Sequence, residues 1–149
     1  TGFMNAKSHA DRIDGFRKYV KNYKDIKIVE IVENHDDEFE SYHLTYDMLK
    51  EHKEIDSVFI VAGGVYGAGR AIQEFQKERS ICAISFDDVD TTRELIRNDV
   101  IQATICQQSI KQGELSLEVL LNYFIKNEIP KNRTIYTEIQ IKIKSNIDM

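Results

Sequence analysis

The chain is poor in several residue types, and each shortage excludes a class of protein. Its 149 residues include 1 Pro, 2 Cys and no Trp, while 42% are hydrophobic. So little proline among so many apolar residues excludes a disordered chain. The longest apolar stretch, residues 58–69, contains four glycines, whereas a membrane span needs about 18 apolar residues in a row. We therefore expect one soluble globular domain with no membrane contact.

Positive charge is also scarce, because 20 Lys+Arg face 25 Asp+Glu and the net charge is −5. This balance argues against direct binding to DNA or RNA, which needs a basic surface. Cys82 and Cys106 lie in separate apolar runs and not in loops. Such placement predicts buried, reduced thiols and a cytoplasmic location.

Helical and strand-like patterns alternate along the chain. Helices are predicted over 8–22, 39–49, 70–78, 91–98 and 109–127, and strands over 26–32, 57–62, 81–86, 102–106 and 134–144. Ser8 and Asp11 resemble a capping box for the first helix. The last strand alternates apolar and polar residues, which is typical of a sheet edge. The order predicts an α/β fold with an open, mostly parallel, doubly wound sheet and helices on both faces.

In such sheets a ligand binds beyond the carboxyl ends of the strands. The residues directly after the predicted strands are polar or glycine: Asn34, Gly63, Gly64, Asp87, Asp88, Gln107 and Gln108. We therefore expect a binding site at this edge of the sheet.

The segment 63–69 is rich in glycine and lies between a predicted strand and a predicted helix. Its spacing is not that of a G-x-G-x-x-G dinucleotide loop, and it lacks the lysine of a phosphate-binding loop. A tight turn followed by close packing of the helix explains the glycines better.

Asp87 and Asp88 directly follow the predicted strand 81–86. An acid at this place can bind Mg²⁺, accept a phosphoryl group, or accept hydrogen bonds from ligand hydroxyls. Phosphotransfer would need further acids and a lysine at the neighbouring strand ends, where Gly63 and Gln107 stand instead. Asp88 or Asp90 is also placed to cap the following helix, which leaves Asp87 as the better ligand contact.

The histidines and cysteines indicate neither a metal site nor a nucleophile. The four histidines lack the H-x-x-x-H spacing, and the cysteines do not pair with them at metal-binding separations. Both thiols are predicted inside strands, which is a poor place for a nucleophile. We predict no metal and no cofactor, and nothing in the sequence demands an enzyme.

Three motifs carry a family resemblance. They are Arg12-Ile13-Asp14-Gly15-Phe16, Phe86-Asp87-Asp88 and Ala103-Thr104-Ile105-Cys106-Gln107-Gln108, with Gln112-Gly113 shortly after. With these motifs the chain resembles the effector-binding core of LacI-type (LacI/GalR family) transcriptional regulators. More broadly, it is similar to periplasmic sugar-binding proteins of the ribose-binding type. The resemblance covers essentially the whole chain.

The resemblance implies a two-lobed fold of the periplasmic-binding-protein type, with the effector held between the lobes. On this interpretation residues 1–149 form a single effector-binding fragment. It comprises the second lobe, the crossover helix 109–127 and the return strand 134–144. The helix-turn-helix and most of the first lobe are then absent.

The resemblance also implies four ligand-binding positions. Arg12 resembles the arginine that hydrogen-bonds the effector, and Asp87 the aspartate that accepts hydrogen bonds from sugar hydroxyls. Gln107 resembles the polar residue that closes the cleft at the crossover. Gly63 stands at the fourth position, where Gly63-Gly64 replaces the Asn-Asp of many sugar-binding relatives. This replacement predicts a different or larger effector.

The function that the resemblance implies is ligand sensing, without catalysis, in a LacI-type regulator whose lobes close on a sugar and change DNA binding. The implied protein is a cytoplasmic homodimer that contacts DNA through the absent domain alone. The alternative is the sugar-binding receptor of an ABC transporter, which shares the fold. A receiver-like phosphotransfer domain built on Asp87 is a third, weaker interpretation, since the lysine and the partner acids are missing.

Overall fold

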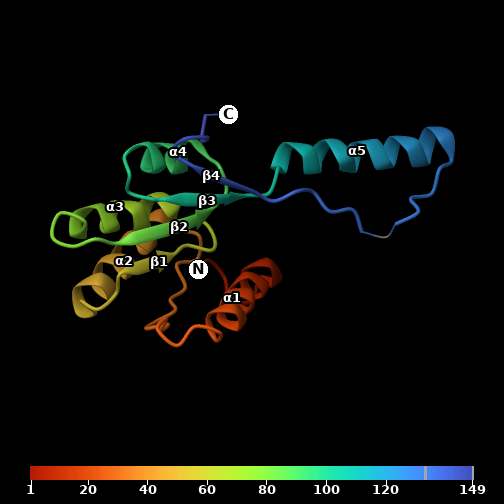
Figure 1. Ribbon diagram of the computed structural model, residues 1–149. Coiled ribbons are helices and arrows are strands. Elements are labelled where there is room, and N and C mark those ends of the chain that lie inside the picture. Colours follow the sequence, from red (N-terminus) through yellow and green to blue (C-terminus); the bar gives the residue numbers. More distant parts are fainter. Residues whose placement is uncertain (133, 149) are drawn as a thin grey trace.

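The computed structural model describes residues 1–132 and 134–148 (Figure 1). The helices are α1 (Lys7–Val20), α2 (Glu38–Glu51), α3 (Val65–Phe75), α4 (Asp90–Arg97) and α5 (Ser109–Lys126). The strands are β1 (Ser57–Phe59), β2 (Cys82–Phe86), β3 (Ala103–Cys106) and β4 (Gln140–Ile143). Apart from the strand predicted over 26–32, the elements follow the predicted order.

The strands form one open sheet in the order β1-β2-β3-β4. β1 pairs with β2 and β2 with β3 in parallel, whereas β3 and β4 are antiparallel. The predicted mostly parallel α/β sheet is therefore confirmed. The alternating segment 134–144 does supply the edge strand, but the strand covers Gln140–Ile143 alone.

Side chains alternate along each strand, so both faces of the sheet carry side chains. Helices pack on both of these faces. The main core lies on one face and joins apolar side chains of α2, α3, α4 and β2, among them Leu49, Ile72, Leu95 and Ala83. On the other face Phe16 of α1 stacks on Phe59 of β1, with ring centroids 4.9 Å apart. Farther toward β4 this second face is open, since Ile84 is 37% and Ile143 44% exposed.

The glycines of segment 63–69 serve packing and a turn, as predicted. A Cβ on Gly67 would stand 1.8 Å from the carbonyl oxygen of Glu38, so α2 and α3 approach each other at backbone distance. A Cβ on Gly69 would lie 2.5 Å from a methyl of Leu95 in α4. Gly64 has φ +78 at the start of α3, a conformation that glycine adopts without steric cost.

The strand predicted over 26–32 is wrong, because this segment forms no strand. At its end it pairs with Thr1, whose nitrogen donates to the Val32 carbonyl and whose carbonyl accepts from the Asn34 nitrogen. One residue is too short a partner for a ladder. Val29 still packs against the main core, so the β-branched pattern reflects partial burial.

The helix caps also differ from the prediction. α1 begins at Lys7 after Ala6, and no side chain caps it, so the capping box of Ser8 and Asp11 is wrong. Asp37 caps α2 by accepting a hydrogen bond from the Glu40 nitrogen at 2.7 Å.

Residues 109–132 and 134–139, with α5 as their first part, form an arm that projects away from the sheet (Figure 1). None of the α5 side chains is buried among the described residues. The Gln107 carbonyl accepts hydrogen bonds from Gln112 Nε2 and from Thr137 Oγ1. These bonds tie the outgoing and returning chain together at the base of the arm. No helix among the described residues has the length and apolar character to cross a membrane.

Candidate functional site

The carboxyl ends of β1, β2 and β3 meet at one edge of the sheet, because these strands are parallel. Asp87 follows β2 and Gln107 follows β3 at this edge. Phe86 pairs with Ile105, which sets the two loops side by side. The structure thus brings two predicted site residues together.

Asp87 is held on both its backbone and its side chain. Its nitrogen donates to the Ile105 carbonyl at 2.9 Å, and its carbonyl accepts from Thr104 Oγ1 at 2.9 Å. Its φ of 68 lies in the left-handed region, which aspartate tolerates better than most residues. Gln107 Nε2 donates to Asp87 Oδ1 at 2.9 Å. The exposed carboxylate is therefore oriented before any ligand arrives.

Arg12 reaches the same edge from α1. Its NH1 group donates to the Val61 carbonyl, just beyond β1. Its guanidinium carbon lies 3.9 Å from the centre of the Phe86 ring, which is a cation–π contact. A guanidinium has five N–H donors, so Arg12 keeps donors for a ligand while the ring and the carbonyl fix its plane.

Gly63 lies at the same edge beyond β1 and is exposed. Its nitrogen donates to Asp36 Oδ1 at 2.7 Å. Asn34, another candidate from the sequence, is buried, and its Nδ2 donates to Ser41 Oγ and to the Gly63 carbonyl. Asn34 therefore holds the loop together and is not free to contact a ligand.

A comparison with known protein families matches residues 1–128 to the periplasmic binding protein domain. The chain belongs to this family. Curated protein sequences gave no significant match.

Solved structures similar to this periplasmic binding protein domain share its fold. The sugar-binding protein of a sugar ABC transporter from Bacillus halodurans matches with a TM-score of 0.87 at 23% identity, over 99% of this chain and 54% of that chain. GanP, a glucose-galactose binding protein from Geobacillus stearothermophilus, matches with a TM-score of 0.83 at 22% identity, over 93% and 49%.

An ABC transporter solute binding protein from Agrobacterium vitis, with bound D-fucose, has a TM-score of 0.83 at 27% identity, over 92% of this chain and 47% of that chain. The periplasmic binding protein domain described here thus spans about half the length of each of these three proteins.

Asp88 does not cap α4, contrary to the prediction, because Val89 holds the capping position and no side chain caps the helix. Asp88 instead pairs with Arg93 at 2.6 Å and with Lys142 of β4 at 2.9 Å. Burial by itself would raise the pKa of Asp88, but the hydrogen bonds from Arg93 and Lys142 outweigh it and lower that pKa. Asp88 is thus a structural acid, whereas Asp87 is the exposed one.

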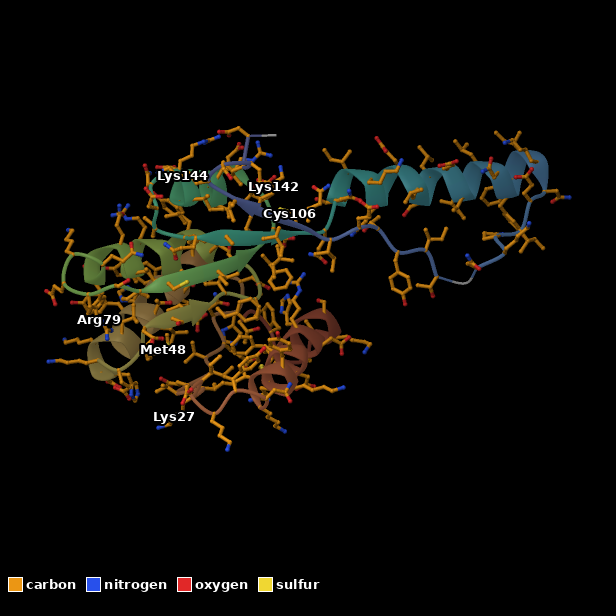
Figure 2. All side chains as sticks on the ribbon, viewed as in Figure 1. Lys27, Met48, Arg79, Cys106, Lys142 and Lys144 are labelled. Carbon is orange, nitrogen blue, oxygen red and sulfur yellow. The ribbon has the colours of Figure 1, made fainter. Side chains whose placement is uncertain are left out.

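The two cysteines are free and lie in different strands. Cys106 is buried near Lys142 of the neighbouring strand (Figure 2), and burial raises the pKa of its thiol. Cys82 is exposed, so the prediction that both thiols are buried is wrong for it. Cys82 starts its strand on the open face of the sheet, where no helix of the described residues covers it.

This edge of the periplasmic binding protein domain offers binding groups: the carboxylate of Asp87, the guanidinium of Arg12 and the amide of Gln107. Gln108, the other polar residue predicted after β3, has φ 52 at the start of α5, and its side chain does not cap this helix.

Among the described residues, no three His, Cys, Asp or Glu side chains gather closely enough to hold a metal ion. Asp36 is the edge residue that the sequence analysis missed.

Proposed function

We propose that the chain is the sugar-binding lobe of a solute receptor of the kind that serves ABC transporters. The sugar lies at the carboxyl edge of the sheet and contacts Arg12, Asp87 and Gln107. Family membership supports a binding role, and so does the 27% identical relative with bound D-fucose. The proposed function contains no catalytic step.

The observation that carries this proposal is the pairing of Asp87 with Gln107, next to Phe86, whose ring contacts the guanidinium of Arg12. Oδ1 of Asp87 takes the hydrogen bond from Gln107, and Oδ2 receives none from the described residues. Sugar hydroxyls both donate and accept. A carboxylate therefore accepts from them while a guanidinium donates to them, and each charged hydrogen bond contributes roughly 1.5–3 kcal/mol.

A second lobe completes this proposed site. The chain spans about half the length of its solved relatives, and the arm begins two residues after Gln107. We propose that the arm leads into a lobe that closes over the sugar from the other side and excludes water from it. Gln107 then lies at the crossover, where closure brings the two lobes together.

The LacI-type regulator predicted from the motifs receives no specific support from the solved relatives named above. Those relatives are sugar-binding proteins, so the transport receptor is the better-supported alternative. The cytoplasmic location, the homodimer and DNA contact through a further domain stay predictions of the regulator interpretation.

Isothermal titration calorimetry on the full-length protein tests the proposal. The panel is D-glucose, D-galactose, D-fucose, D-xylose, D-ribose and L-arabinose. At least one aldose should bind saturably, and Asp87→Asn should weaken its binding by more than tenfold, because a charge-assisted acceptor is lost.

Asp47→Asn is the matched control. Asp47 is an exposed acid of α2, away from the edge. The affinity of Asp47→Asn for the aldose should therefore stay within twofold of that of the wild type. A folded protein that binds none of the six aldoses would overturn the sugar-receptor proposal. Unchanged affinity of Asp87→Asn would remove Asp87 from the site.

A further inference from the structure

Asp36 presents a second carboxylate at the same edge of the sheet. It follows the segment 26–34 and has φ 58, in the left-handed region. Its Oδ1 accepts a hydrogen bond from the nitrogen of Gly63, just beyond β1. Because Arg12 binds the Val61 carbonyl of the same chain segment, Asp36 and Arg12 both attach to the end of β1.

Two glycines make room for this carboxylate. A Cβ on Gly2 would lie 2.3 Å from Asp36 Oδ1 and 2.6 Å from Oδ2. A Cβ on Gly63 would lie 2.9 Å from Oδ1 and 3.0 Å from the Asp36 Cβ. At both positions the distance to Asp36 Oδ1 is shorter than real Cβ contacts, so a larger residue at either position would displace the acid. Asp36 thus occupies the space that a side chain at position 63 would take.

Asp36 also lacks an ion-pair partner among the described residues, and its Oδ2 receives no hydrogen bond from them. The residue is exposed, unlike Asp88, which Arg93 and Lys142 neutralise. An oriented carboxylate with one free oxygen is a ready acceptor for a ligand hydroxyl.

We propose that Asp36 is a specificity-determining ligand contact that accepts a hydrogen bond from one sugar hydroxyl. This inference rests on the proposed sugar-binding function and adds a residue to the same site. Asp36 supplies, from the neighbouring loop, the polar group that Gly63 lacks. The site therefore holds its sugar between two acids, Asp36 and Asp87, with Arg12 as the donor.

The test is a double-mutant cycle between the side chain and the sugar. Calorimetry on the full-length protein compares wild type with Asp36→Asn, and Asp47→Asn serves as the control. The ligands are the aldose of the six-sugar panel that binds the wild type most tightly and its monodeoxy derivatives. Asparagine keeps the shape and the acceptor for the Gly63 nitrogen, so the apo protein should unfold within about 2 °C of the wild type.

Asp36→Asn should bind the parent aldose at least tenfold more weakly. For one deoxy derivative, the one lacking the hydroxyl that Asp36 accepts from, wild type and variant should agree within twofold. An unchanged affinity for the parent sugar would overturn the role of Asp36 but leave the proposed function standing. An equal loss for every derivative would overturn it too, since it would show that Asp36 acts on the loop alone. Failure of the wild type to bind any aldose would instead overturn the proposed function and this inference with it.

Discussion

At the scale of single residues, Asp88 joins three elements through one carboxylate. It follows β2, pairs with Arg93 of α4 and pairs with Lys142 of β4. Figure 2 shows Lys142 on the edge strand that leads back from the arm. The side chains of Asp88 and Lys142 are 14% and 16% exposed, so solvent screens this pair less than a surface pair.

Asp88→Asn should lower the free energy of unfolding by about 1–3 kcal/mol at neutral pH, since charged hydrogen bonds are lost. The folded-state pKa of Asp88 lies below its ordinary value of 3.8. The stabilisation is therefore fully present above that ordinary value and is lost as the pH falls through the lowered folded pKa. Urea unfolding of both proteins between pH 2 and 7 measures this.

Asp99→Asn is the matched control for that experiment. Asp99 pairs with Lys144, which directly follows β4, but the two side chains are 71% and 56% exposed. Its loss should cost about 0.5 kcal/mol or less. A difference between wild type and Asp88→Asn that stays constant from neutral to acid pH would contradict the ion-pair account.

Some site residues could be predicted from the sequence and one could not. Asp87 and Gln107 directly follow strands, so alternation of strands and helices was enough to place them on one edge. Asp36 could not be predicted in this way. Its role depends on the open space at Gly2 and Gly63, which lie far from it in the sequence.

At the scale of secondary-structure elements, α2 and α3 approach each other closely enough to test the packing by mutation. Gly67 sits against the Glu38 carbonyl, and its nitrogen donates to Glu38 Oε2 at 2.6 Å. A backbone carbonyl cannot swing away as a flexible side chain does. The two helices would therefore have to separate to admit even a methyl group.

Gly67→Ala should destabilise the fold by about 3 kcal/mol, the upper end of the usual cost of overpacking. Gly15→Ala is the opposite case, since nothing lies within 4 Å of a Cβ there. In the middle of α1 this change should stabilise the fold by about 0.5–1 kcal/mol. Thermal and urea unfolding compare the two variants, and equal effects would contradict the close approach of α2 and α3.

Helices that bury one face, such as α2 and α4, were predicted well, because burial of that face sets both the periodicity and the structure. The segment 26–32 shows the limit of that argument. Its β-branched residues favour extended backbone, but a strand also needs a partner alongside it. Only tertiary structure tells whether one is there.

At the scale of the whole molecule, two apolar surfaces lack a partner among the described residues. One is the arm, where Leu120 and Phe124 of α5 are 53% and 75% exposed. The other is the open face of the sheet, with Ile84 and Ile141. Apolar surface of this extent favours burial against another surface.

The 149-residue chain alone should therefore self-associate at micromolar concentration. The charged variant Leu120→Glu/Phe124→Glu should shift it toward the monomer, because it removes apolar area from α5. Multi-angle light scattering measures both. A clean monomer of the unmodified chain that also binds an aldose tightly would contradict the proposed second lobe.

The central claim is that a sugar binds at the carboxyl edge of the sheet. An NMR titration of the isotope-labelled full-length protein, with the aldose that binds most tightly, tests it most directly. The account predicts that the largest amide shifts gather at Asp36, Gly63, Asp87 and Gln107, with the side-chain Nε signal of Arg12. Shifts that gather instead on the outer face of α2 and α3, around Tyr42 and Tyr46, would contradict the account.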